Sequence, residues 1–152
     1  MKAILLIMIG LSSLSMAAES PRFTKADGVV TDSETTLEWQ DDYGDNADSI
    51  KVAKWREAID YCEGLSLNSQ DDWRLPNKKE LLSIVDYSAY DPAISSVFEE
   101  IASDFFKYYW SSTTYASDTG DALLVNFKNG YTDNSSKHHD YSVRCVRSGQ
   151  NE

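Results

Sequence analysis

Two cysteines, Cys62 and Cys145, constrain what this 152-residue chain can fold into more than any other feature. More than 80 residues separate them. In an exported protein, an even pair of cysteines indicates a disulfide first. A metal site or a catalytic thiol would need helper residues, and the segments that flank the two cysteines offer none. On the chain-entropy model, a bridge across so long a loop contributes about 4–5 kcal/mol to stability.

The first 17 residues predict export of the chain. Met1-Lys2 is a short basic start, residues 3–14 form an apolar run too short to span a bilayer, and Ser15-Met16-Ala17 is a small-x-small cleavage site. No later apolar stretch is long enough for a transmembrane helix. We therefore expect a mature chain of residues 18–152, the size of one domain, in the periplasm or outside the cell.

Acidic residues outnumber basic ones, 25 to 14, which gives a net charge of −11. Removal of the signal takes away one lysine and no acidic residue, so the mature charge is −12. Such a chain repels nucleic acid and anionic membrane surfaces over most of its area, and neither is an expected partner. The hydrophobic content of 41% nevertheless favours a folded domain over an acidic disordered one.

Strand patterns lie towards both ends of the mature chain. Residues 22–41 predict a hairpin that turns at Asp27-Gly28, and Asn129-Gly130 predicts a type I′ turn. The polar segment 133–140 is predicted to be an exposed loop. Further strands are predicted at residues 108–115, 122–127, 131–132 and 141–146.

Helical periodicity marks the middle of the chain, with predicted helices at residues 55–65, 77–87 and 92–105. Cys62 lies on the apolar face of the first helix, which directs its thiol into the core. Asn77 and Glu80 form a capping box at the start of the second helix. Hairpin, helices and antiparallel sheet follow one another along the chain, an order that predicts an α+β domain.

The sequence offers two groups of candidate metal ligands. The aspartates of the acidic loop, with oxygen ligands suited to Ca²⁺, are Asp41, Asp42, Asp45 and Asp48. Their spacing is not that of an EF-hand, and an acidic loop is more often simply solvated. The segment His138-His139-Asp140 is the second group, but adjacent side chains of an extended segment point in opposite directions. No cofactor other than Ca²⁺ is suggested.

Three motifs stand in the second half of the chain. They are Asp72-Trp73-Arg74-Leu75-Pro76-Asn77-Lys78-Lys79-Glu80-Leu81, Tyr109-Trp110-Ser111-Ser112-Thr113 and Val143-Arg144-Cys145-Val146-Arg147. Together they resemble the Lcl C-terminal domain family, a bacterial extracytoplasmic module of C-type-lectin-like fold. The resemblance runs from Asp27-Gly28 to Arg147 and implies a Cys62–Cys145 bridge between the first helix and the last strand.

The motif residues are expected to build the fold rather than to contact a ligand. Trp73 and Trp110 could form an aromatic platform for sugars, but large aromatic side chains are more often core. The arginines could bind an anion, yet at least one is expected to be tied to an acidic partner such as Glu80. The residues given a structural role are Trp73, Arg74, Pro76, Asn77, Glu80, Trp110 and Arg144.

The resemblance implies a non-catalytic binding module for a glycan or an extracellular protein. Loops 117–121 and 133–141 would form the recognition surface, because binding residues concentrate on loops that a rigid scaffold positions. The proposed ligand contacts are Tyr115, Tyr131, Asn134, His138 and Tyr141. The adhesin that names the family recognises sulfated glycosaminoglycans, whereas this chain is strongly acidic. Its candidates for a local basic patch are Lys128, Lys137, His138, Arg144 and Arg147.

The alternative function is a metal-dependent enzyme on the similar scaffold of formylglycine-generating enzymes. Those enzymes rely on reactive cysteines, and both cysteines of this chain are better assigned to a bridge. The two classes predict different surfaces. An enzyme should show a deep pocket with converging carboxylates or histidines, and a binder should show a shallow, aromatic-edged surface.

Overall fold

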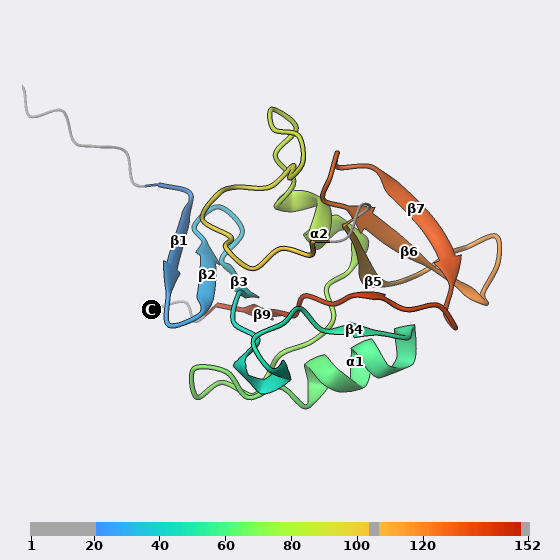
Figure 1. Ribbon diagram of the computed structural model, residues 1–152, viewed down its shortest axis with the longest axis horizontal. Coiled ribbons are helices and arrows are strands. Elements are labelled where there is room, and N and C mark those ends of the chain that lie inside the picture. The colour runs from blue at the N-terminus through green and yellow to red at the C-terminus, as the bar shows by residue number, and fades with distance from the viewer. Residues whose placement is uncertain (1–20, 104–106, 150–152) are drawn as a thin grey trace, which may run out of the picture.

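The computed structural model describes residues 21–103 and 107–149 (Figure 1). The predicted signal, residues 1–17, lies outside the described residues. Two sheets, two α-helices and one disulfide make up a small α+β domain, as the sequence predicts. In the described part of the chain, no helix is long and apolar enough to cross a membrane.

The first sheet has four antiparallel strands in the order β1-β2-β3-β9. Their bounds are β1 (Phe23–Ala26), β2 (Val29–Asp32), β3 (Leu37–Gln40) and β9 (Val146–Ser148). The β1–β2 turn consists of Asp27 and Gly28, both at positive φ (48° and 76°). Positive φ at both central residues is what a type I′ turn needs, so the predicted turn is confirmed.

The second sheet has five strands in the order β4-β8-β5-β6-β7. Their bounds are β4 (Val52–Ala53), β5 (Tyr108–Thr114), β6 (Asp121–Asn126), β7 (Thr132–Ser136) and β8 (Tyr141–Ser142). β5 and β8 pair in parallel, and the other neighbours are antiparallel. The sheet is therefore mixed rather than wholly antiparallel.

The predicted last strand, 141–146, is wrong as one continuous element. Its first residues belong to β8 in the second sheet, and its final residue opens β9 in the first sheet. Between them, Val143 N–H donates to the carbonyl of Lys51, and Gln40 N–H donates to the carbonyl of Cys145. The segment thus crosses from one sheet to the other and joins them.

The predicted loop at 133–140 and the predicted turn at Asn129-Gly130 are also corrected. Residues 132–136 pair with β6 as strand β7, because a polar, charged sequence is tolerated at a sheet edge. The hairpin turn is longer than type I′, and among its residues only Gly130 has positive φ (79°). Gly130 N–H donates to the carbonyl of Asn126 (2.7 Å).

The helices are α1 (Trp55–Glu63) and α2 (Lys78–Ser83), and a short 3₁₀ turn, η1, covers Gly44–Asn46. The predicted capping box is present, with Asn77 Oδ1 accepting from Glu80 N–H and Glu80 Oε2 accepting from Asn77 N–H. α2 ends four residues earlier than predicted. Asp86 N–H donates to the carbonyl of Ala93, which draws the chain out of the helix.

The predicted helix at 92–105 is wrong for the part that the structure describes, because residues 92–103 contain no helix. Backbone N–H groups of this segment donate to residues far away in the sequence instead. Ala93 N–H donates to the carbonyl of Phe127, and Glu99 N–H donates to Asp41 Oδ2. The apolar side chains of this segment still face inward, with Ile94 and Phe98 buried.

The core consists of two clusters, one containing residues of α1 and the other residues of α2. Adjacent residues of β5 point to opposite sides, so Trp110 joins the α1 cluster and Tyr109 the α2 cluster. The Cys62–Cys145 disulfide, with an S–S distance of 2.05 Å, is confirmed. Trp73 and Trp110 are 2% and 0% exposed, which confirms them as core and excludes a sugar platform.

Candidate functional site

The two predicted recognition loops do lie side by side. Lys137 N–H donates to the carbonyl of Gly120, and Lys137 Nζ donates to the carbonyl of Thr119 (both 2.9 Å). Tyr131, however, lies at the opposite end of the β6–β7 hairpin, since Asp121 pairs with Ser136 at one end and Val125 with Thr132 at the other. The five predicted ligand contacts therefore do not form one surface.

Two of the five predicted contacts are engaged within the protein. Asn134 Nδ2 donates to Asp121 Oδ2 (2.7 Å), and Tyr141 Oη donates to Ser135 Oγ (3.1 Å). The ring of Tyr141 also packs edge-on against Trp110, with centroids 5.0 Å apart. Tyr115 is half-buried, and His138 is exposed.

Three exposed tyrosines, Tyr87, Tyr90 and Tyr131, lie on or next to the loop between β6 and β7; we call them the tyrosine surface. These three side chains are 70%, 70% and 71% exposed, and Val52 is the other large apolar side chain exposed in the described residues. The predicted second helix ends at Tyr87, and no role is predicted for Tyr90. The available signal was the turn-forming composition of residues 86–92, which is incompatible with continued helix.

The three tyrosines gather around the loop between β6 and β7. A Cβ at Gly130 would lie 2.9 Å from Tyr87 Cε1, so the Tyr87 ring rests directly on this glycine. Asp91 N–H donates to the carbonyl of Lys128 (2.8 Å), and Lys128 Nζ lies 6.0 Å from the Tyr90 ring centroid. Tyr131 follows Gly130 in the same loop. Glycine at position 130 thus provides both the turn and the seat for an exposed ring.

The acidic loop does not bring its four aspartates together as a metal site. Asp42 Oδ1 accepts from Gly44 N–H (2.7 Å), and Asp45 Oδ1 accepts from Tyr61 Oη (3.1 Å). Asp48 is exposed. Across residues 21–103 and 107–149, no group of three or more His, Cys, Asp or Glu side chains could hold a metal ion.

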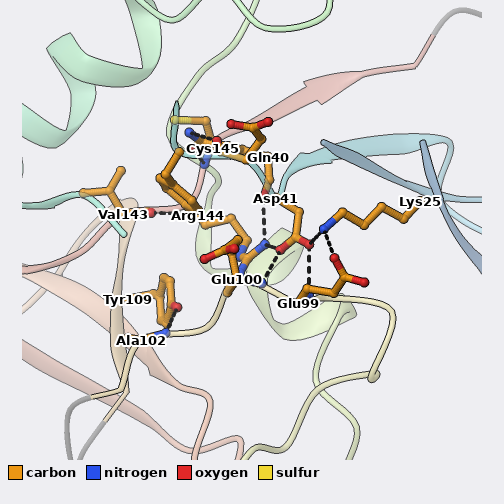
Figure 2. Close-up of polar contacts among 12 residues, drawn as sticks. Lys25, Gln40, Asp41, Glu99, Glu100, Ala102, Tyr109, Val143, Arg144 and Cys145 are labelled. Carbon is orange, nitrogen blue, oxygen red and sulfur yellow. Dashed lines mark hydrogen bonds and ion pairs between the residues drawn. The ribbon is translucent and has the colours of Figure 1, made fainter. Parts of the chain in front are cut away.

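Asp41 is buried and serves as a structural anion (Figure 2). Its carboxylate accepts from Arg144 Nη1 (2.8 Å) and from Lys25 Nζ (2.7 Å). It also accepts from the backbone N–H groups of Glu99 (2.9 Å) and Glu100 (3.2 Å). With four donors, the carboxylate has no lone pair left for Ca²⁺, which contradicts its predicted role as a ligand.

The arginines of the sequence motifs are structural too. Arg144 is buried and donates to the carbonyls of Gln40 and Glu100 as well as to Asp41. Burial lowers the pKa of Arg144, but the interactions with Tyr43, Tyr109 and Asp41 outweigh it and raise the pKa above its ordinary value. The fully buried Arg144 is therefore not available to the predicted basic patch.

Arg147 and Arg74 behave in the same way. Arg147 is also buried and pairs with Glu38 and Asp72. Arg74 makes two hydrogen bonds to Glu80, of 2.8 and 2.6 Å, as the motif interpretation predicts. Of the residues predicted for a basic patch, the two arginines are thus buried ion-pair partners rather than surface charges.

The described residues thus form a disulfide-bridged α+β domain that exposes three tyrosines. The model of the Lcl C-terminal domain family matches residues 28–147, and the chain belongs to that family. Membership supports an adhesin-like module as the coarse description of the protein. No curated protein matches the chain.

Proposed function

We propose that the protein is an exported, non-catalytic recognition module that binds a glycan on the tyrosine surface. The observation that carries this proposal is the gathering of three highly exposed tyrosines at one loop cluster. Leaving such rings in water forgoes the free energy of burying them, so an exposed aromatic cluster marks an interaction site.

Sugar rings suit this surface for two reasons. A pyranose presents an apolar C–H face to an aromatic ring and hydroxyl groups at its edge. Tyrosine offers the matching ring together with a hydroxyl, and Tyr87 is held in place by its seat on Gly130.

The charge of the chain favours a neutral or cationic glycan. The net charge of −11 opposes a sulfated polymer, and Arg144 and Arg147 are unavailable to offset it at the surface. Support against the metal-dependent enzyme alternative comes from Asp41, whose carboxylate is committed to Arg144, Lys25 and two backbone donors.

The proposal is tested by presenting residues 18–152, with the disulfide intact, to glycan and protein arrays. Binding to neutral glycans that is lost in the Tyr87→Ala/Tyr131→Ala double variant supports it. Tyr115→Ala is the matched control, because the N–H of this half-buried tyrosine donates to the carbonyl of Asp121, at the end of the β6–β7 hairpin away from Tyr131. Binding to protein spots alone, or metal-dependent turnover in a hydrolase screen, would overturn the glycan assignment. N-terminal sequencing of exported protein should begin at Ala18.

A further inference from the structure

We propose a second binding site, independent of the tyrosine surface, that takes an organic ammonium group. It is a cavity of about 500 Å³ lined by Ser49, Ile50, Val52, Tyr108 and residues 100–103 and 140–142. A volume in this range is typical of sites for small ligands or single side chains.

The walls of the cavity suit an apolar body next to a cation. Ile50, Val52 and Ile101 supply aliphatic surface. Tyr108 and Tyr141 supply two rings set at 76° to each other, with centroids 6.0 Å apart. Two tyrosine rings at such an angle can contact one ligand from two sides, and ring faces attract ammonium groups.

The charges of the lining have one sign. Glu100 and Asp140 carry carboxylates, and no lysine, arginine or histidine is among the described residues that line the cavity. The surrounding protein is strongly acidic as well. An ammonium ion is therefore favoured at this site, and a carboxylate or sulfate is repelled.

Buried polar groups hold one wall of the cavity in place (Figure 2). Residues 100–103 have no regular secondary structure. Asp41 accepts from Glu100 N–H, Arg144 donates to the carbonyl of Glu100, and Tyr109 Oη accepts from Ala102 N–H (2.8 Å). The backbone that carries Glu100 is thus fixed before a ligand arrives, which lowers the entropy lost on binding.

The test is an NMR titration of the mature protein with 2-phenylethylammonium, with 2-phenylethanol as neutral isostere and 3-phenylpropanoate as anion. The ammonium probe should bind about tenfold more tightly than the alcohol, and the anion should bind least. The shifted amide signals should be those of Val52, Ala102 and Ser142, which line the cavity, while Gly130 at the tyrosine surface stays unchanged. Equal binding of amine and alcohol, or shifts confined to the tyrosine surface, would overturn the proposal.

Variants identify the charges responsible. Glu100→Gln/Asp140→Asn should reduce the affinity for the amine to that for the alcohol, whereas Asp133→Asn, on the exposed edge strand, should leave both unchanged. Should the double variant lose its fold, Val52→Lys provides a second test. Val52 is 55% exposed at the cavity, and a lysine there should abolish amine binding by repulsion. Unchanged amine affinity in either folded variant would contradict the proposal.

The source of the ammonium group is settled by a lysine tripeptide with both ends blocked. Binding of this peptide with the same response to the variants identifies the lysine side chain of a protein as the ligand group. Binding of the free amine without the peptide identifies a small amine. The Tyr87→Ala/Tyr131→Ala variant should bind the amine and the peptide with unchanged affinity. Failure of this proposal and failure of the glycan proposal are therefore distinguishable.

Discussion

Arg144 Nη1 and Asp41 Oδ1 lie 2.8 Å apart in an ion pair whose two side chains are 1% and 0% exposed. The pair joins residues 103 positions apart in the chain. Arg144 belongs to the segment that crosses between the sheets, and Asp41 directly follows β3. Through Glu99 and Glu100, the same carboxylate also holds residues 99–100, so one buried charge organises three segments.

Replacement of Arg144 by methionine should reduce the free energy of unfolding by about 3–5 kcal/mol, because Asp41 stays buried with one charge partner fewer. Urea denaturation measures this change. Arg56→Ala is the control, since Arg56 pairs with Asp60 at the surface and its loss should cost less than about 1 kcal/mol. Similar losses of unfolding free energy in the two variants would show that the buried pair stabilises the fold no more than a surface pair does.

Loss of the disulfide should also destabilise the domain strongly. Cys62 and Cys145 are 83 positions apart, and the entropy of closing such a loop corresponds to about 4.5 kcal/mol. We expect the Cys62→Ser/Cys145→Ser double variant to lose about that amount in denaturant titrations. Two free thiols recovered by peptide mapping of the exported protein under non-reducing conditions would refute the bridge itself.

Trp73 is expected to matter for folding and not for ligand contact. Its side chain is 2% exposed, and its Nε1–H donates to the carbonyl of Gln70 (3.2 Å). Trp73→Ala should cost about 3–5 kcal/mol, as truncations of large core aromatics do. Ligand binding should fall only in proportion to the unfolded fraction. An unchanged thermal midpoint with abolished binding would make this residue a binding platform.

Glu80 predicts a specific loss of stability in acid. Burial raises the pKa of Glu80, but hydrogen bonds from Arg74 and from Asn77 N–H outweigh it and hold the pKa below its ordinary value of 4.5. A lowered pKa stabilises the fold above the pKa of the unfolded state, and the contribution disappears as pH falls through the folded pKa.

The stability difference between wild type and Glu80→Gln should therefore shrink as the pH is lowered from 7 to below about 4. Urea titrations at a series of pH values measure this difference. A difference that stays constant down to pH 3 would show that the carboxylate does not act through its charge.

Local sequence patterns predicted the parts of the fold that depend on residues close together in the sequence. The first helix was predictable because apolar residues recur at helical spacing around Cys62, and the α2 start because Asn77 and Glu80 cap each other. The helix expected at 92–105 failed because Asp41, far away in sequence, takes the N–H groups of Glu99 and Glu100.

The candidate site is formed by residues far apart in the sequence, and most of it could not be predicted from the sequence. Tyr131 was predicted as a contact, but Tyr87 reaches the same loop only because the turn after α2 docks on Gly130. The role of Asp41 was equally invisible, because an aspartate in an acidic run gives no sign of a buried arginine partner. The sequence of a loop shows which side chains it carries, but tertiary packing decides which of them are buried.

Calorimetric titration of an array-identified neutral glycan into wild type, Tyr87→Ala, Tyr131→Ala and Tyr115→Ala tests recognition by the tyrosine surface most directly. Loss of a stacking ring at the surface should weaken binding about tenfold in each of the first two variants, with thermal midpoints close to wild type. Tyr115→Ala should bind as wild type does. Full affinity in Tyr87→Ala and Tyr131→Ala, with loss only in Tyr115→Ala, would contradict the proposed site and return recognition to the other end of the hairpin.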